Sequence, residues 1–160
     1  MSEPMKATVI TASNRAAAGV YEDTGGPVIV KALAELGFDV IGPVVVPDGQ
    51  PVADAIAQAL DGGARAILTT GGTGLTPTDL TPEMTRPFLE REVPGIAEAI
   101  RAYGSAKGVP TAALSRGLAG IAGTALIVNL PGSKGGVKDG LAVVVPLLLH
   151  AVQQIVGGDH

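Results

Sequence analysis

The sequence has 160 residues, with no cysteine, no tryptophan and only 2% aromatic residues. The lack of cysteine excludes disulfides, thiolate metal sites and cysteine nucleophiles. Apolar residues still make up 46% of the chain, so Val, Leu, Ile and Ala must build the core, as is usual where helices pack on a parallel sheet. The length predicts a single domain over residues 1–160.

The chain also lacks a block of basic residues, and its net charge is −4. This disfavours nucleic acid as a partner, because affinity for nucleic acid depends largely on neutralised phosphates. The longest apolar run, residues 141–149, contains Pro146 and is too short to span a bilayer. The first six residues have no apolar core of the length that a signal peptide needs. We therefore expect a cytoplasmic protein with no membrane partner.

Apolar runs and helical periodicities alternate along the chain. Alternation of this kind predicts a three-layer α/β/α fold with a mostly parallel sheet covered on both faces. Residues 119–124 add a short strand pair to the pattern. Strands are expected over 7–12, 40–46, 66–68 and 127–130, and helices over 27–36, 51–60, from Pro94 past Tyr103, and over 137–155, where Pro146 should introduce a bend.

The most informative segment is residues 66–82. An apolar strand leads into Gly71, Gly72 and Gly74, which permit backbone angles and close approaches that a side chain would forbid. A helix start follows, with Thr81 as its N-cap and a proline at its first position. A strand, a glycine loop and a helix start together are typical of an anion cradle. The Walker lysine and the third glycine of the dinucleotide fingerprint are missing, so this is either another kind of phosphate loop or a plain glycine-rich turn.

Polar segments follow the expected strands at four places. In a parallel sheet, ligands bind beyond the carboxyl ends of the strands. One site can therefore use all four segments, which are Ser13-Asn14-Arg15, Asp48-Gly49, Gly71 to Asp79 and Pro131-Gly132-Ser133.

Two aspartates are the best candidates for chemistry. Asp48 either caps the helix that begins near Pro51 or faces the glycine loop. Asp79 either closes a turn after Pro77 or faces the same loop. Two carboxylates beside a glycine loop indicate magnesium, which typically takes one or two carboxylates together with substrate phosphates.

Other polar residues have two interpretations each. The only histidines are His150, in the last helix, and His160, so neither a Ser-His-Asp site nor a histidine metal cluster is expected. Arg116 either clamps an anion or forms a surface ion pair. Residues 130–133 form either a second phosphate-binding turn or a simple turn in which Ser133 caps a helix.

Residues 70–83, Thr-Gly-Gly-Thr-Gly-Leu-Thr-Pro-Thr-Asp-Leu-Thr-Pro-Glu, resemble the signature of the molybdenum-cofactor biosynthesis proteins of the Mog and MoaB type. The same domain occurs in gephyrin and in its plant counterpart. The resemblance covers nearly the whole chain, with further matches at residues 13–15, 23–26, 46–48, 114–116 and 129–133.

The resemblance implies an α/β fold, usually trimeric, that binds molybdopterin. Catalytic members transfer AMP from Mg-ATP to the terminal phosphate of molybdopterin and release pyrophosphate. The adenylylated product is then the substrate for molybdenum insertion, so the insertion protein is a candidate partner. We accordingly predict a homotrimeric molybdopterin adenylyltransferase with ATP as co-substrate and Mg²⁺ as metal.

The resemblance also implies roles for individual residues. Asp48 and Asp79 match the family's functional acidic positions, and we assign them to magnesium and to the orientation of the reacting phosphates. The nucleophile is a phosphate monoester, already anionic at neutral pH, so no histidine base is needed. The residues assigned to substrate binding are Ser13, Gly71, Gly72, Thr73, Gly74, Thr76, Ser115, Asn129, Pro131, Gly132 and Ser133.

The chain departs from the family pattern at three places. Asn14 stands where many relatives carry aspartate, and Thr78 replaces a common arginine. Residues 134–136, Lys-Gly-Gly, replace a common proline. The missing arginine removes a phosphate donor, for which Lys134 offers a replacement charge. Because none of these changes touches Asp48 or Asp79, we expect an active enzyme.

Two alternatives stay open at this level. One is a non-catalytic relative that binds molybdopterin without adenylyl transfer. The other is a trimeric scaffold of the same pathway, with the apolar helix over residues 137–155 as its interface.

Overall fold

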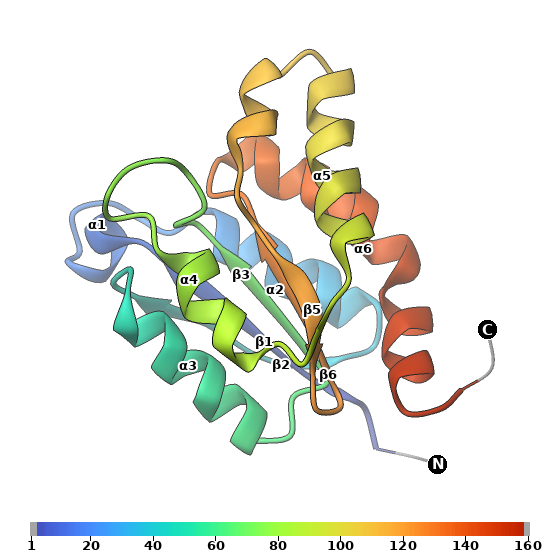
Figure 1. Ribbon diagram of the computed structural model, residues 1–160. Helices are drawn as coiled ribbons and strands as arrows, with labels where there is room; N and C mark the ends of the chain where they lie inside the picture. The colour runs from blue at the N-terminus through green and yellow to red at the C-terminus, as the bar shows by residue number, and fades with distance from the viewer. Residues whose placement is uncertain (1–2, 159–160) are drawn as a thin grey trace.

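The computed structural model describes residues 3–158, which form one α/β unit (Figure 1). Short strands alternate with helices, as the apolar runs and periodicities predict. The elements in chain order are β1 (Lys6–Ala12), α1 (Asn14–Ala17), α2 (Gly25–Glu35), β2 (Asp39–Val46), α3 (Gln50–Asp61), β3 (Ala66–Thr70), α4 (Thr81–Thr85), the 3-10 helix η1 (Arg86–Phe88), β4 (Arg91–Glu92), α5 (Pro94–Ala106), the 3-10 helix η2 (Pro110–Leu114), β5 (Ala119–Ala122), β6 (Ala125–Leu130) and α6 (Lys134–Ile155).

The strands form one six-stranded sheet in the order β2-β1-β3-β6-β5-β4. The first four strands of this order are parallel, β5 runs antiparallel to β6, and β4 runs antiparallel to β5. The expectation of a mostly parallel sheet between helical layers is confirmed. It follows that β1, β2, β3 and β6 end at the same edge of the sheet.

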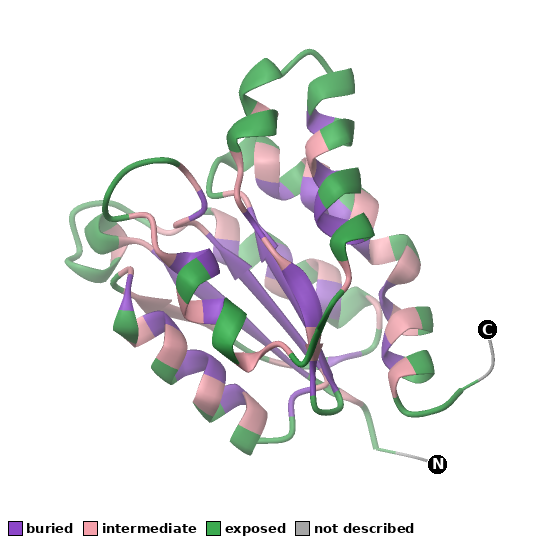
Figure 2. Ribbon diagram, in the orientation of Figure 1, coloured by how far each residue is buried: buried purple, intermediate pink, exposed green. Residues whose placement is uncertain are grey.

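The core has two parts, one on each face of the sheet. Helices α2, α5 and α6 cover one face, and α3 and α4 cover the other. Successive residues of β6 alternate between them: Leu126 and Val128 belong to the first part and Ile127 to the second. Figure 2 shows the central strands fully buried and the outer helix faces exposed. Burial on both faces explains why the strands read as continuous apolar runs.

The structure corrects the expected N-terminus of α4. Leu80, not Thr81, occupies the N-cap position, and it makes no side-chain capping bond. The Thr81 side chain is instead completely buried. The sequence also gave no sign of β4, because its two residues, Arg91 and Glu92, are polar and exposed.

Helix α6 runs for 22 residues, and Pro146 lies inside it without ending it. By length and composition this helix is apolar enough to cross a membrane, with 33% of the apolar window buried. Here Val144, Leu148 and Val152 pack into the core on the α2 face of the sheet. From the sequence this helix is expected over residues 137–155, and in the structure it begins three residues earlier, at Lys134.

Candidate functional site

The four polar segments meet at one edge of the sheet, as the parallel order requires. They enclose a polar pocket of about 380 Å³. Figure 1 shows α1 beside the loop that follows β3, and residues of both segments line this pocket. Of the predicted site residues, those that line this polar pocket are Ser13, Asp48, Gly71, Gly72, Asp79 and Gly132.

A second pocket, also about 380 Å³, opens between the glycine loop, α5, η2 and the start of α6. Ile100, Val109 and Leu114 give it apolar walls, and we call it the apolar pocket. Helix η2 and the polar side chains Arg101 and Asp139 were not anticipated from the sequence, because they depend on how α5 packs on α6. The predicted residues that line it are Gly72, Thr73, Gly74, Asp79, Ser115, Pro131, Gly132 and Ser133.

The two pockets share three residues: Gly72, Asp79 and Gly132. The loops after β3 and β6 touch here, since a Cβ atom on Gly132 would lie 3.0 Å from the Cα atom of Gly71. Two ligands, one in each pocket, would therefore approach each other beside Asp79. This junction is the natural place for a reaction between them.

Asp48 is held by the loops around it. Its Oδ1 atom accepts hydrogen bonds from the backbone N–H groups of Gly49 (2.7 Å) and Leu80 (3.1 Å). Its own N–H donates to the Oδ1 atom of Asn14 (3.0 Å). The N-cap of α3 is Gly49, with no side-chain capping bond, so Asp48 does not cap that helix through its side chain. Burial raises the pKa of the Asp48 carboxyl against the lowering effect of these two N–H donors, and the nearby charge of Asp79 raises it further.

Asp79 closes the turn after Pro77, as one of its two interpretations predicts, and it also lines both pockets. Its Oδ2 atom accepts hydrogen bonds from the N–H of Thr76 (3.0 Å) and from the Thr76 hydroxyl (2.8 Å). The two roles are compatible, because the turn fixes the carboxylate at the pocket junction. Thr76 lines neither pocket. Its position therefore suits a residue that holds Asp79 in place better than one that contacts the ligand, which is the role predicted from the sequence.

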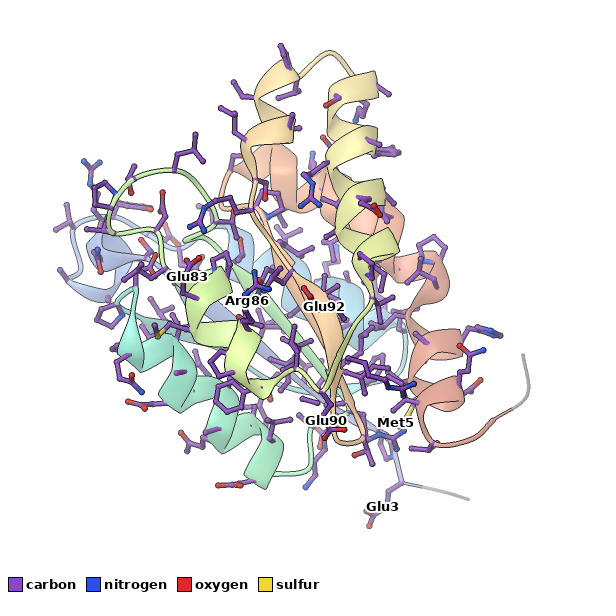
Figure 3. The ribbon with its side chains drawn as sticks, viewed as in Figure 1. Glu3, Met5, Glu83, Arg86, Glu90 and Glu92 are labelled. Atoms are coloured by element: carbon purple, nitrogen blue, oxygen red, sulfur yellow. The ribbon has the colours of Figure 1, made fainter. Side chains whose placement is uncertain are left out.

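Arg116 braces the glycine loop. Its N–H donates to the carbonyl of Thr73 (2.8 Å), and its guanidinium donates to the carbonyls of Gly74 (2.8 Å) and Asp79 (2.7 Å). It also forms an ion pair with Glu83, which lies on α4 (Figure 3). Of the two interpretations, the ion pair is observed. The donors that would clamp an anion are directed at the loop instead.

Asn129 has a different place from the predicted one. It is 2% exposed, and its amide donates to the hydroxyls of Thr69 (2.9 Å) and Thr85 (3.1 Å). Its Oδ1 atom accepts from the N–H of Leu118 (3.0 Å). Asn129 lines neither pocket. It joins β3, β6 and α4 beneath the site.

Thr81 carries the clearest sign of an incomplete polar site. Within residues 3–158, its Oγ1 atom is the buried side-chain polar atom without a hydrogen-bond partner. Both this atom and the Oδ2 atom of Asp48 lie within 3.0 Å of the position that a Cβ atom on Gly72 would occupy. A buried hydroxyl without a partner costs about 1–3 kcal/mol. A bound cation with its water would give both oxygens a partner, so these residues fit a hydrated magnesium ion.

The remaining candidates are placed as follows. Ser133 caps α6, because its Oγ atom accepts a hydrogen bond from the N–H of Gly136 (3.0 Å). His150 is exposed on α6 and lines neither pocket, and His160 lies outside the described residues. Within residues 3–158, no group of three His, Cys, Asp or Glu side chains is placed to hold a metal alone.

Comparisons with known proteins identify the family of this chain. Residues 8–150 match the family model described as a probable molybdopterin binding domain. The chain is 38% identical to a protein of Haemophilus influenzae named molybdopterin adenylyltransferase, over 88% of this chain and 73% of that one. It is 36% identical to the protein of that name from Helicobacter pylori, over 93% of this chain and 86% of that one.

Solved structures give the same result. The Mog protein of Mycobacterium ulcerans superposes with a TM-score of 0.90 at 50% identity, covering 94% of this chain and 99% of that one. MoaB of Thermus thermophilus superposes with a TM-score of 0.88 at 42% identity, covering 96% of this chain and 97% of that one.

Some relatives are longer. The chain spans 25% of the Drosophila melanogaster molybdenum cofactor synthesis protein cinnamon and 48% of a bifunctional protein of Synechococcus elongatus. The match to the family model nevertheless covers most of the present chain. The chain therefore belongs to the molybdopterin-binding domain family of molybdenum-cofactor biosynthesis proteins.

Proposed function

We propose that this protein is a molybdopterin adenylyltransferase, which joins AMP from ATP to the terminal phosphate of molybdopterin. The observation that carries the proposal is the pair of pockets that share Gly72, Asp79 and Gly132. A protein that only binds one ligand has no need of a second pocket joined to the first. The names of the similar bacterial proteins support the same activity.

The polar pocket suits the nucleotide. Its lining includes Ser13, Arg15 and Thr24 as well as backbone from the glycine loop, and exposed N–H groups and a guanidinium are ordinary donors to phosphate. Tyr21, whose hydroxyl lies 3.0 Å from the Ser13 hydroxyl, offers an aromatic face at the same pocket. The apolar pocket suits the flat pterin ring, which has little charge.

The reaction then takes place where the pockets meet. An oxygen of the molybdopterin phosphate forms a bond to the α-phosphorus of ATP, the bond from that phosphorus to the bridging oxygen breaks, and pyrophosphate leaves. The attacking phosphate is already anionic at neutral pH, so the protein must position the groups and neutralise charge rather than remove a proton. Gly72 and Gly132 leave room for the two phosphates to approach, and Asp79 faces both.

Magnesium is part of the proposal. Asp48 and Asp79 would hold it together with the substrate phosphates, and Thr81 would contact its water. The ion would supply positive charge to the reacting phosphates. In the protein, Gly49 and Leu80 hold Asp48 in place through Oδ1, and Thr76 holds Asp79.

The proposal is tested by incubating the protein with molybdopterin and radiolabelled Mg-ATP. We expect label from the α-phosphate to enter molybdopterin, with release of one pyrophosphate. Tight molybdopterin binding without label transfer, with any divalent metal, would favour the alternative of a binding protein. Omission of the metal is the matched control, and it should abolish transfer while leaving molybdopterin binding intact.

We further propose that the protein works as a cytoplasmic homotrimer, with the molybdenum insertion protein as the acceptor of its product. Ala32 and Leu36 of α2 line an open groove with Leu141, Val145 and Pro146 of α6, and a second copy would cover this apolar surface. Closed rings are the usual result of such association. Light scattering tests it: a mass equal to one chain, 15.9 kDa, would refute the trimer.

A further inference from the structure

Asp139 is an acidic side chain that lines the apolar pocket but not the polar pocket. It lies on α6, and its side chain is only 13% exposed. Its Oδ1 atom accepts a hydrogen bond from the ammonium of Lys107, the C-cap residue of α5 (3.2 Å). Asp139 is not one of the two aspartates predicted to be functional. Its side chain also takes no part in a turn or a helix cap.

Lys107 holds one oxygen of this carboxylate, and the other oxygen lies near Gly104, which also lines the apolar pocket. Lys107 is itself placed over the Tyr103 ring, 5.6 Å from the ring centroid. The Oδ2 atom of Asp139 lies 3.9 Å from the position of a Cβ atom on Gly104. Any side chain at Gly104 would also collide with Ala112 of η2, at 2.6 Å, so this glycine lets η2 close the pocket beside the carboxylate.

A surface ion pair alone does not explain this arrangement. Such pairs contribute about 0–1 kcal/mol, and they need no burial. Removing a carboxylate from water is costly unless it gains partners. Asp139 has given up most of its contact with water in a pocket walled by Ile100, Val109 and Leu114. A ligand that supplies hydrogen-bond donors would complete its shell.

The chemistry of the carboxylate defines that ligand. An ionised carboxylate only accepts hydrogen bonds, and it accepts two parallel ones from a pair of adjacent donors. A pterin ring has such a pair on one edge, the N3–H and the 2-amino group. We propose that Asp139 is a specificity-determining residue that binds this 2-amino-4-oxopyrimidine edge. The inference rests on the proposed function, because it assumes that the pterin enters the apolar pocket.

Comparison of pterin with lumazine tests the inference directly. Lumazine has the same two rings and keeps the N3–H, but a carbonyl replaces the 2-amino group, so an acceptor would face one carboxylate oxygen and one hydrogen bond would be lost. The full-length protein is titrated with each compound by saturation-transfer NMR. We expect the wild type to prefer pterin by at least about tenfold, the ratio that one lost hydrogen bond to a charged group produces.

Asp139→Asn should remove the preference, because the amide replaces one accepting oxygen with a donor. Lys107→Met keeps the carboxylate and should keep the preference. Asp54→Asn is the matched surface control, since Asp54 is exposed on α3 and bonds only Gln50 within its own helix. All three variants should bind ATP like the wild type.

The results separate the inference from the proposed function. Equal binding of pterin and lumazine by the wild type, binding of neither, or an unchanged preference in Asp139→Asn would overturn the role of Asp139. The wild-type comparison decides even if the variant fails to fold. None of these results affects AMP transfer to molybdopterin, which is measured separately and alone decides the proposed function.

Discussion

Arg116 and Glu83 form a two-pronged ion pair across 33 residues of sequence, with Nη1 2.7 Å from Oε2 and Nη2 3.2 Å from Oε1. The same guanidinium donates to the carbonyls of Gly74 and Asp79. One side chain thus joins both ends of the loop 74–79 to α4. The hydrogen bond with Arg116 lowers the pKa of Glu83, and the hydrogen bond with Glu83 raises the pKa of Arg116.

Replacement of Arg116 by methionine should therefore loosen the glycine loop. We expect the free energy of unfolding to fall by about 1–2 kcal/mol, because partly exposed charged hydrogen bonds are lost, and AMP transfer to fall more than stability. Denaturant unfolding and the transfer assay measure the two effects. Glu83→Gln is the control, because it removes the ion pair but leaves the bonds to the loop carbonyls. If the two variants were equally impaired in transfer, the bracing role of Arg116 would be wrong.

The pKa of Glu83 gives this ion pair a pH dependence. A carboxyl whose pKa is lower in the folded state stabilises the protein above its ordinary pKa, here 4.5, and this contribution is lost as the pH falls through the lowered value. Because the pair is partly exposed, salt should weaken it. Its contribution to stability is therefore small next to that of the loop bonds.

The raised pKa of Asp48 has the opposite effect on folding stability to the lowered pKa of Glu83. A carboxyl whose pKa is higher in the folded state destabilises the protein as the pH rises through that value. Asp48→Asn should therefore retain or increase the melting temperature at neutral pH while it abolishes magnesium-dependent transfer. A lower melting temperature with normal transfer would show that Asp48 is structural only.

The sequence was sufficient to predict the edge of the sheet at which the site forms. Strand ends were visible as apolar runs followed by polar segments, and the parallel order then brought Ser13, Asp48, Gly71 and Gly132 together. The rule that ligands bind beyond the carboxyl ends of parallel strands needs no side-chain detail.

The contacts within the site could not be predicted in the same way. Lys107 and Asp139 are 32 residues apart, and no periodicity connects them. Asn129 has a polar side chain of the kind that could contact a ligand, but its amide N–H groups donate to Thr69 on β3 and Thr85 on α4, and its Oδ1 atom accepts from Leu118. Thr81 looked like an N-cap because its sequence context is that of a cap, whereas packing turned its side chain inward.

The hydroxyl of Thr81 should matter through magnesium. Thr81→Val keeps the shape of the buried side chain and removes the hydroxyl, so stability should be equal or slightly higher, because a buried polar group without a partner is lost. We expect weaker magnesium binding, measured by calorimetry in the presence of a non-hydrolysable ATP analogue. Thr81→Ser should restore it. Equal magnesium affinity in Thr81→Val and wild type would exclude this role.

Asp79→Asn separates charge from turn geometry. An amide oxygen can still accept the hydrogen bonds from Thr76, so the variant should fold and lose about 1 kcal/mol of stability or less. Transfer should fall by orders of magnitude, with molybdopterin affinity retained, because the charge at the pocket junction is removed. Wild-type transfer in this variant would leave Asp79 as a turn residue alone.

Gly72 is the position where the smallest change should have the largest effect on the site. Its φ of +67° is unfavourable for any other residue, and a Cβ atom would collide with both Thr81 Oγ1 and Asp48 Oδ2. Gly72→Ala should therefore displace the Asp48 carboxylate and abolish magnesium-dependent transfer. Gly63→Ala is the matched control, because Gly63 also has a positive φ, +86°, but has open space around its Cβ position. Both variants carry the same kind of backbone strain, but Gly72→Ala adds the collision with Thr81 and Asp48, so it should lose more stability than Gly63→Ala in denaturant unfolding. Only Gly72→Ala should lose transfer, and equal transfer in the two variants would show that the space beside Gly72 is not part of the site.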